Sequence, residues 1–300
     1  MSATVGLLGA GRMGSGICAA LVRAGHDVLA FDVRTEREED VRAAGARWVA
    51  DAGALAGAAD VLVSSLPGSP ELAEAMAALT GELRPGTTWI DTTSAAPAVA
   101  APLVAAAGAR GVDCLDAPVG GGPAEAAAGT LTLYVGGAPA TLERRRAVLE
   151  ALGTVEYMGG AGAGYTTKLL VNLLWFGQAL ATGEAMLVAA RSGIDLEVLR
   201  LALGRSAAAS EFIARDAGRI LEGDYLPAFG LDRCCEELDA VVAAARELGV
   251  PFELSSEVAR AYSRALERYG AVDGELLAVA LLEERAGVAL RRERPAAEGR

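Results

Sequence analysis

Hydrophobic and polar positions follow two different patterns along this chain of 300 residues. Up to about residue 163, short apolar runs alternate with longer stretches in which apolar residues recur at helical spacing. The runs that predict strands are 4–8, 28–31, 61–66, 87–90, 112–115, 131–135 and 155–158. The stretches that predict helices are 15–24, 70–83, 98–107 and 141–152. Strands that alternate with helices predict a doubly wound parallel sheet, covered by helices on both faces.

Beyond residue 163 only helical periodicity remains, interrupted by glycine and proline. The helices expected there are 167–192, 196–204, 210–221, 229–248, 255–269 and 274–285, with 291–300 as a frayed tail. We therefore expect an α/β domain over residues 1–163 and an all-α domain over 164–300. The first helix of the second domain is long, and it is expected to join the two as an interdomain helix.

The first predicted strand ends in a glycine turn, Gly9-Ala10-Gly11-Arg12-Met13-Gly14, and a helix follows. The next strand closes on an acidic residue, Asp32. This strand–turn–helix–strand context, with the acid in place, is the fingerprint of a Rossmann-type dinucleotide-binding domain. Glycines let the backbone approach the pyrophosphate, and the helix N-terminus favours its negative charge. All six residues of the turn are therefore expected to bind the cofactor.

The residues after the second strand, Asp32, Val33 and Arg34, are expected beside the adenosine ribose. Asp32 would accept hydrogen bonds from the ribose hydroxyls and repel a 2′-phosphate, which favours NAD. Arg34 could instead pair with that phosphate, so NADP stays possible. In open α/β sheets, ligands bind outside the carboxyl ends of the strands. The loops there are expected to add Leu66, Pro67, Glu71 and Ser94 to the cofactor site, with Ser94 also touching the substrate.

Lys168 is the only lysine of the chain, and Asn172 follows it at the i,i+4 spacing that puts both on one helix face. Arginine stays protonated, whereas lysine can be tuned to lose its proton, so Lys168 is a candidate for proton transfer. Its pKa of about 10.4 would have to fall through burial and a nearby positive nicotinamide ring. The alternatives are a chance lysine at a helix end and an asparagine that only bonds within a domain interface.

A second unusual stretch runs from Asp116 to Glu125 and contains Gly120, Gly121 and Gly122. Three glycines expose backbone N–H groups, and Pro123 suits the first position of a helix. Such a loop before a helix is an anion site that suits a substrate carboxylate. A mere tight turn is the alternative.

Composition excludes several classes of function. The net charge of −12 argues against nucleic acid or an anionic membrane as a partner, since both demand a basic face. The single histidine, His26, lies in a turn at the wrong end of the sheet, and the four cysteines form no CxxC pair. We therefore expect no metal site, and with it no zinc-dependent dehydrogenase.

The most apolar window, 169–190, is long enough to span a bilayer but contains Asn172, Gln178 and Glu184. We expect a helix buried between domains rather than a membrane span. The N-terminus lacks a basic n-region, so no signal peptide and a cytoplasmic location are expected.

Taken together, these stretches resemble the β-hydroxyacid dehydrogenase family, whose members include 3-hydroxyisobutyrate dehydrogenase and tartronate semialdehyde reductase. The resemblance covers nearly the whole chain. It rests on the turn at 9–14, Leu66-Pro67, the stretches 91–97, 116–122 and 129–131, and Gly162-Ala163-Gly164 with Lys168 and Asn172.

The resemblance implies an NAD(P)-dependent oxidoreductase that acts on a small 3-hydroxyacid or its semialdehyde. Lys168 would be the general acid/base, Asn172 would contact the substrate, and the glycine loop would hold its carboxylate. A homodimer or larger homo-oligomer is also implied.

Two positions depart from the family pattern. Gly120 stands where the family has serine, and Glu236-Glu237 replaces its usual Lys-Asp. A less negative or amine-bearing substrate would be more comfortable near Glu236. Two other functions therefore stay open: a reductase of a non-standard carbonyl or imine, and a nucleotide-binding protein without catalysis.

Overall fold

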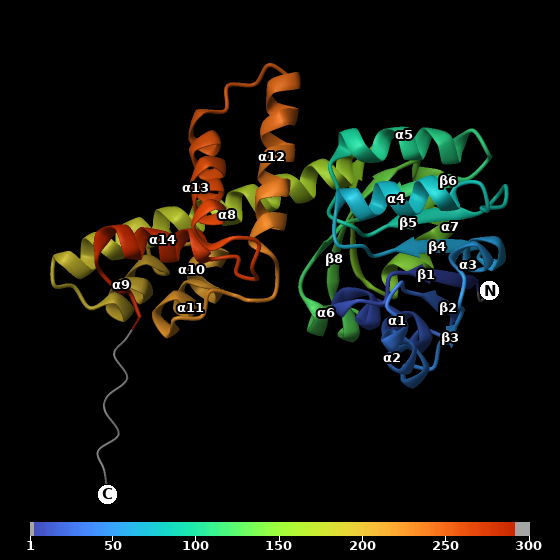
Figure 1. Cartoon of the computed structure of the whole chain (residues 1–300), viewed down its shortest axis with the longest axis horizontal. Coiled ribbons are helices and arrows are strands. Elements are labelled where there is room, and N and C mark those ends of the chain that lie inside the picture. The colour runs from blue at the N-terminus through green and yellow to red at the C-terminus, as the bar shows by residue number, and fades with distance from the viewer. Residues whose placement is uncertain (1–2, 292–300) are drawn as a thin grey trace, which may run out of the picture. The chain divides into compact units, whose positions relative to one another are not determined.

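A nine-stranded sheet forms the centre of the N-terminal half of the protein (Figure 1), in the order β3-β2-β1-β4-β5-β6-β8-β7 with β9 beside β8. The structure is a computed structural model that describes residues 3–291. The strands are β1 (Thr4–Leu8), β2 (Asp27–Phe31), β3 (Arg47–Trp48), β4 (Val61–Ser64), β5 (Thr88–Asp91), β6 (Asp113–Asp116), β7 (Val119–Gly120), β8 (Leu131–Gly137) and β9 (Gly153–Gly159).

Helices cover both faces of this sheet, as the alternating pattern predicts. They are α1 (Arg12–Arg23), α2 (Glu38–Ala43), α3 (Ala52–Ala58), α4 (Ser69–Leu79), α5 (Pro97–Gly108), α6 (Pro123–Ala128) and α7 (Pro139–Glu150). Apolar side chains of α1, α2, α6 and α7 pack on one face. Those of α3, α4 and α5 pack on the other, where Tyr165 joins them. The expected Rossmann-type fold is confirmed.

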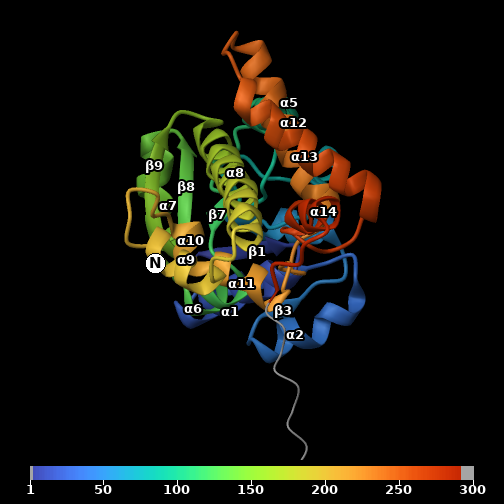
Figure 2. The same ribbon diagram turned by 90° about the vertical axis from the view of Figure 1, so that its left-hand side faces the viewer.

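Two features of the sheet differ from the simple alternating picture. Residues 35–58, to which the sequence pattern assigned no element, form a short 3-10 turn, α2, β3 and α3. Strand β8 runs antiparallel to β6 and β7, while the pair of β8 and β9, which lie side by side in Figure 2, is parallel. Parallel neighbours need a crossover of a dozen or more residues. The connection from β7 to β8 holds only the short helix α6, so the chain returns antiparallel.

The second half is all-helical, as predicted, with α8 (Ala163–Arg191), α9 (Leu196–Leu203), α10 (Glu211–Arg215), α11 (Ala217–Glu222), α12 (Leu231–Glu247), α13 (Glu253–Tyr269) and α14 (Leu277–Ala286). The chain divides into two compact units within α8, Met1–Leu169 and Leu170–Arg300. The expected boundary between residues 163 and 164 falls at the start of that helix. Of the expected tail, residues 292–300 lie outside the described residues.

The expected helix over 210–221 is broken into α10 and α11 at Asp216. The Asp216 carboxylate accepts a hydrogen bond from the Trp175 indole at 2.9 Å. The Trp175 ring also packs edge-on against Phe212, with ring centroids 5.3 Å apart. The break therefore lies at the residue that binds the partly buried Trp175 indole N–H of α8.

Helix α8 is, within residues 3–291, the helix whose length and apolar composition could cross a membrane. Half of its most apolar window is buried inside the protein. The core helix of a soluble protein passes the same test, so this is weak evidence for a span.

The N-terminal end of α8 is held by Asp116, the last residue of β6. Its carboxylate accepts hydrogen bonds from the N–H groups of Gly162 at 2.8 Å, Gly164 at 2.7 Å and Tyr165 at 3.1 Å. The first N–H groups of a helix have no partner within the helix. One buried carboxylate thus satisfies three donors and suits the positive end of the helix dipole.

A second carboxylate, Asp91 at the end of β5, holds the same turn of α8. Its Oδ2 accepts the Tyr165 hydroxyl at 2.7 Å, and its Oδ1 accepts the hydroxyls of Ser64 at 2.6 Å and Thr93 at 2.7 Å. Burial raises the pKa of the Asp91 carboxyl to about 6, although these hydrogen bonds oppose the rise. Burial and the neighbouring Asp91 also raise the pKa of the Tyr165 phenol, which therefore donates.

Close packing at the start of α8 gives a first test. A Cβ added at Gly164 would lie 2.2 Å from the Tyr134 carbonyl oxygen and 2.8 Å from Asp116 Oδ2. We expect Gly164→Ala to lower the free energy of unfolding by about 1–3 kcal/mol, because the backbone must shift. Gly160→Ala is the control, since a Cβ there meets nothing within 4 Å. Urea denaturation measures both, and equal effects would show that the packing at Gly164 is not tight.

The raised pKa of Asp91 gives a second test, in the pH dependence of stability. Its carboxyl titrates near pH 6 when folded, against 3.8 as the ordinary value, so the folded protein binds more protons between these values. The stabilisation that comes from protonated Asp91 is fully present below about pH 4 and is lost as the pH rises through 6. Relative to Asp91→Asn, the wild type should lose roughly 2–3 kcal/mol between pH 4 and 7. Denaturation curves that run parallel for the two proteins would contradict this.

Candidate active site

The glycine turn after β1 has the geometry of a phosphate cradle. Gly9 has φ +94°, and a Cβ added there would lie 2.3 Å from the Ser65 carbonyl oxygen. A Cβ at Gly14 would lie 2.0 Å from the Gly9 carbonyl oxygen. Gly11 has more room and meets only the Arg34 guanidinium at 3.2 Å. The first turn of α1 therefore packs directly on the end of β1 at positions that only glycine allows. This fits a pyrophosphate at the N-terminus of α1.

Asp32 ties this turn to the end of β2. Its carboxylate, 6% exposed, accepts hydrogen bonds from the Ala10 N–H at 2.8 Å and the Arg34 N–H at 2.9 Å. Burial alone would raise the pKa of Asp32, but bonds from Arg34 and Ala10 lower it overall. The carboxylate therefore stays ionised, as a partner for ribose hydroxyls must.

Arg34 is exposed, but its guanidinium lies next to the turn. Its Nε is 3.3 Å from Asp32 Oδ1, and one guanidinium nitrogen faces Gly11. Val33, between them in sequence, is exposed. The expected residues 32–34 are thus brought next to the glycine turn. Asp32, which favours NAD, and Arg34, which could bind the 2′-phosphate of NADP, lie side by side at this point, so the structure is compatible with either cofactor.

The other expected cofactor residues lie at the same edge of the sheet. The Leu66 N–H donates to the Thr93 hydroxyl at 3.1 Å, which links the loops after β4 and β5. Pro67 is exposed, Glu71 lies in the first turn of α4, and Ser94 is half-buried in the loop after β5. Arg12 and Met13 begin α1. These positions follow the carboxyl ends of neighbouring parallel strands.

The glycine loop differs from the expected anion site in one respect. The Gly122 N–H already donates to Glu125 Oε2 at 3.0 Å, so the Glu125 side chain caps the start of α6. Three free N–H donors were expected at 120–122, and this one is taken by the chain itself. Gly121 is exposed with φ +110°, and Gly120 ends β7 opposite Thr132. The loop needs glycine at 121, but it holds fewer free donors than predicted.

Lys168 and Asn172 lie one turn apart on α8, and both are half-buried. Lys168 directly follows the turn of α8 that Asp116 and Asp91 bind, so these two strand ends fix the backbone from which the Lys168 side chain extends. Asn172 Nδ2 donates to Glu237 Oε2 at 2.6 Å. The amide nitrogen therefore faces Glu237, and the amide oxygen points elsewhere.

The acidic pair on α12 is divided between two environments. Glu237 is buried and bonds Asn172, whereas Glu236 is exposed and forms an ion pair with Arg233 at 3.0 Å. The hypothesis of a cationic substrate had been tied to Glu236. The structure instead makes Glu237 the carboxylate beside Asn172, because Glu236, the preceding position of the helix, faces outward.

Asp91, Asp116, Tyr165 and Tyr134 are not among the predicted site residues, although Asp91 and Asp116 begin two of the stretches that carry the family resemblance. A usable signal was present for the two acids, since each directly follows a predicted inner strand, 87–90 or 112–115, at the edge of the sheet where ligands bind. The tyrosines carried no such signal, because their roles depend on strand pairing and on the packing of α8.

Two further kinds of group were candidates for chemistry, the cysteine thiols and clusters of metal ligands. Burial raises the pKa of the Cys18 thiol to about 11 and those of Cys114 and Cys235 to about 12, so these free thiols stay protonated. No group of three His, Cys, Asp or Glu side chains that could hold a metal occurs within residues 3–291.

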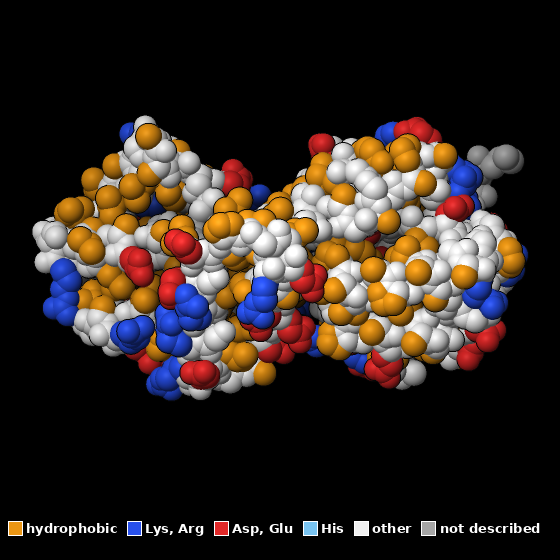
Figure 3. Space-filling model, turned by 90° about the horizontal axis from the view of Figure 1, so that it is seen from above, with side chains coloured by type: hydrophobic (Ala, Val, Ile, Leu, Met, Phe, Trp, Pro, Cys, Tyr) orange, Lys and Arg blue, Asp and Glu red, His pale blue; other side chains and the backbone are white. Residues whose placement is uncertain are grey.

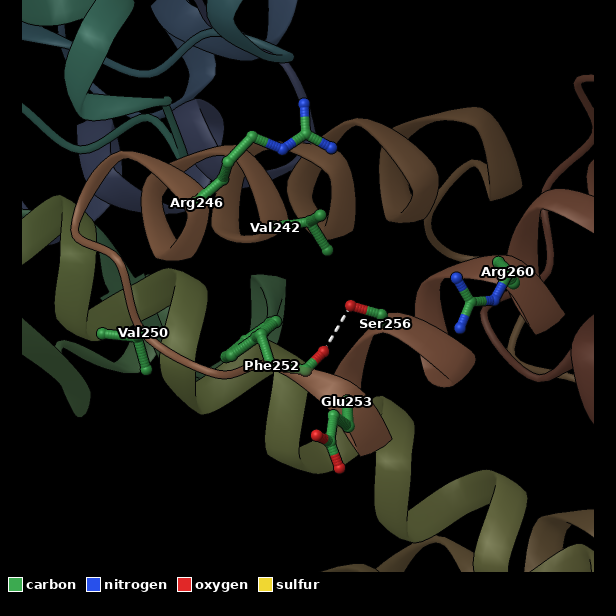
Figure 4. Close-up of a pocket in the computed structure, with 7 residues that line it drawn as sticks. All are labelled: Val242, Arg246, Val250, Phe252, Glu253, Ser256 and Arg260. Carbon is green, nitrogen blue, oxygen red and sulfur yellow. Dashed lines mark hydrogen bonds between the residues drawn. The ribbon is translucent and has the colours of Figure 1, made fainter.

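A pocket of about 370 Å³ lies between α12 and α13 (Figure 4). Val242, Val250 and Phe252 line it together with Arg246 and Arg260. None of the residues expected to bind cofactor or substrate lines this pocket.

Two family models match the chain. Residues 4–160 match the NAD binding domain of 6-phosphogluconate dehydrogenase. Residues 162–282 match the NAD-binding region of NADP-dependent 3-hydroxyisobutyrate dehydrogenase.

Two curated relatives span most of the chain. The L-threonate dehydrogenase of Escherichia coli (strain K12) is 32% identical over 267 residues, which cover 87% of this chain and 88% of that protein. The 2-(hydroxymethyl)glutarate dehydrogenase of Eubacterium barkeri is 30% identical over 260 residues, which cover 85% and 86%.

A solved structure of Mycobacterium tuberculosis 3-hydroxyisobutyrate dehydrogenase with L-serine is similar over both halves. It superposes with a TM-score of 0.85 at 28% identity and covers 94% of this chain and 99% of that one. With the glycine cradle and the ionised Asp32 in place, the chain therefore belongs to the β-hydroxyacid dehydrogenase family and is an NAD(P)-dependent oxidoreductase.

Proposed function

We propose that this enzyme transfers hydride between a nicotinamide and a small 3-hydroxyacid or its semialdehyde, with Lys168 as general acid/base. The observation that carries this proposal is the double anchoring of α8. Asp116 and Asp91, at the ends of β6 and β5, hold the turn just before Lys168. These strand ends belong to the same sheet edge as the glycine cradle after β1. Relatives that act on threonate and 2-(hydroxymethyl)glutarate support a hydroxyacid substrate.

In this mechanism each residue has a defined task. A bound nicotinamide supplies the acceptor or donor of hydride. The neutral Lys168 amine takes the hydroxyl proton during oxidation, and the ammonium form returns it to the carbonyl oxygen during reduction. Asn172, whose amide nitrogen is committed to Glu237, presents its oxygen to a substrate hydroxyl. The Gly120–Gly122 loop and Ser94 hold the far end of the substrate.

For the cofactor we propose NAD as the preferred form. Asp32 is ionised and buried at the end of β2, where its charge would repel a 2′-phosphate. Arg34 donates a hydrogen bond to that carboxylate, so the positive charge that could attract a 2′-phosphate is partly compensated by Asp32.

The buried Glu237 favours a second substrate class. A carboxylate beside Asn172 would stabilise a cationic amine or iminium group on a substrate. Amino-aldehydes and cyclic imines therefore belong in the same assay panel as semialdehydes and ketoacids. Turnover of these alone would place the enzyme among reductases of non-standard carbonyls or imines.

We further propose a homodimer or larger homo-oligomer that works in the cytoplasm. Large apolar side chains are exposed on the helical half, including Leu174, Val188, Val198 and Leu254. The face shown in Figure 3 carries many hydrophobic side chains between its charged ones. Exposed apolar surface of this kind supports association with a second copy. Light scattering of the purified protein measures its oligomeric state.

Replacement of Lys168 tests the mechanism directly. We expect Lys168→Ala to lower kcat by about 10²- to 10⁴-fold, because proton transfer loses its catalyst. Lys168→Arg should be equally impaired, since arginine keeps the charge but cannot release the proton. Steady-state rates are measured from the change in NADH absorbance at saturating cofactor.

Thr166→Ala, an exposed position on the same turn of α8, is the matched control and should keep near wild-type rates. Binding of NADH should be unchanged in all three variants. A Lys168→Arg enzyme of normal activity would rule out lysine as the acid/base.

The cofactor preference has its own test. Asp32→Asn should raise the ratio of kcat/KM for NADPH over NADH by about tenfold, because a charge that repels the 2′-phosphate and accepts ribose hydroxyls is lost. Asp27→Asn, at the exposed start of the same strand, is the control and should leave the ratio unchanged. An unchanged ratio for Asp32→Asn would remove Asp32 from cofactor selection.

A further inference from the structure

Tyr134 is a hydroxyl-bearing side chain beside the glycine loop that no expectation included. It lies on β8, where Leu131, Leu133 and Val135 point into one apolar cluster of the sheet. Successive side chains of a strand alternate, so Tyr134 points to the opposite face, the one on which α8 begins. It is half-buried, and within residues 3–291 its hydroxyl makes no hydrogen bond to another residue. An aromatic side chain with a free hydroxyl is therefore available at this place.

The backbone around Tyr134 fixes where that hydroxyl lies. The Tyr134 N–H donates to the Pro118 carbonyl oxygen at 3.0 Å, and β7 pairs with β8 in the register Gly120↔Thr132. A Cβ built at Gly120 would lie 3.3 Å from the Tyr134 hydroxyl oxygen and 3.5 Å from its ring. The phenol thus occupies the space over Gly120 that a side chain at residue 120 would fill.

The same residue adjoins the start of α8. The backbone of Gly164 packs so closely on Tyr134 that a Cβ would lie 2.2 Å from its carbonyl oxygen. Lys168 follows one turn later on that helix. Tyr134 therefore links the loop proposed to hold the substrate to the helix proposed to supply its proton.

The loop itself is short of donors for a carboxylate. The Gly122 N–H is taken by Glu125, and residues 120–122 have no side chains. A phenol hydroxyl that donates to a carboxylate forms a charge-assisted hydrogen bond, which is stronger than a neutral one. A tyrosine side chain has only two torsions, so fixing the hydroxyl in place costs little conformational entropy.

We infer that Tyr134 is a substrate-binding residue, whose hydroxyl binds the carboxylate of the 3-hydroxyacid over Gly120. The inference rests on the proposed function, since it assumes that the glycine loop receives that carboxylate. It adds a phenol hydroxyl from β8 to the backbone of the glycine loop and the Ser94 side chain, and it selects for acids over neutral alcohols.

The test measures binding of 3-hydroxypropionate to the enzyme–NADH complex by calorimetry, so it does not require turnover. Tyr134→Phe should raise the dissociation constant of the acid about 10- to 100-fold, because only the hydroxyl is lost. The dissociation constant of NADH should not change. Gly120→Ser added to Tyr134→Phe should restore most of the affinity, since the missing hydroxyl leaves room for a serine side chain in the same place.

Tyr157→Phe is the matched control. Its hydroxyl donates to the Gly137 carbonyl oxygen at 3.1 Å, elsewhere in the same unit, so acid binding should remain normal. The inference is wrong if Tyr134→Phe binds the acid within twofold of wild type, if it weakens NADH binding equally, or if serine restores nothing.

Failure of the proposed function gives a different result. A wild-type enzyme that binds 3-hydroxypropionate but never oxidises a 3-hydroxyacid with NAD or NADP would refute the reaction. The selective loss in Tyr134→Phe would still stand. Normal turnover that depends on Lys168 but not on Tyr134 would refute the inference alone. A wild type that binds no 3-hydroxypropionate would overturn the inference directly.

Discussion

The hydrogen bonds from the start of α8 to the Asp116 carboxylate are the constraint on which the candidate site depends. Three N–H groups within four residues converge on one buried side chain at the end of β6. A helix end without such partners would leave polar groups buried and unsatisfied, at a cost of about 1–3 kcal/mol each. Satisfying them here fixes the position of the first turn of α8, just before Lys168.

Glycines make this close approach possible. Gly136, opposite Asp116 in the antiparallel pair of β6 and β8, leaves room for the carboxylate, because a Cβ there would lie 2.4 Å from Asp116 Oδ2. Gly164 does the same on the helix side. The antiparallel direction of β8 thus has a structural consequence, since it brings Gly136 to Asp116 and Tyr134 to the glycine loop.

Carboxylates have different tasks in different parts of the protein. At the cofactor end, Asp32 keeps its charge through backbone hydrogen bonds and Arg34. At the anchor, the buried Asp91 has a raised pKa and serves as an acceptor for Tyr165 and Ser64. On α12, Glu237 orients the Asn172 amide. Carboxylates therefore position the neighbouring elements, whereas Lys168 transfers the proton in the proposed mechanism.

The amino-acid sequence by itself determined the two-part architecture and the dinucleotide turn. Alternating apolar runs and helical periodicity are local signals, and Gly9, Gly14 and Asp32 occur at spacings that physical chemistry ties to one structure. It also placed Lys168 and Asn172 on one helix face, because i,i+4 spacing is a local property.

Only the tertiary structure decided which distant groups meet. The direction of β8, the bonds from Asp116 and Asp91 to α8, the contact of Asn172 with Glu237 and the place of Tyr134 over Gly120 all join residues far apart in the chain. Pairing of this kind depends on strand register and on packing between elements, and neither leaves a periodic signal in the sequence. The individual motifs of the candidate site can therefore be predicted from short stretches of sequence, whereas the contacts between them depend on the tertiary structure.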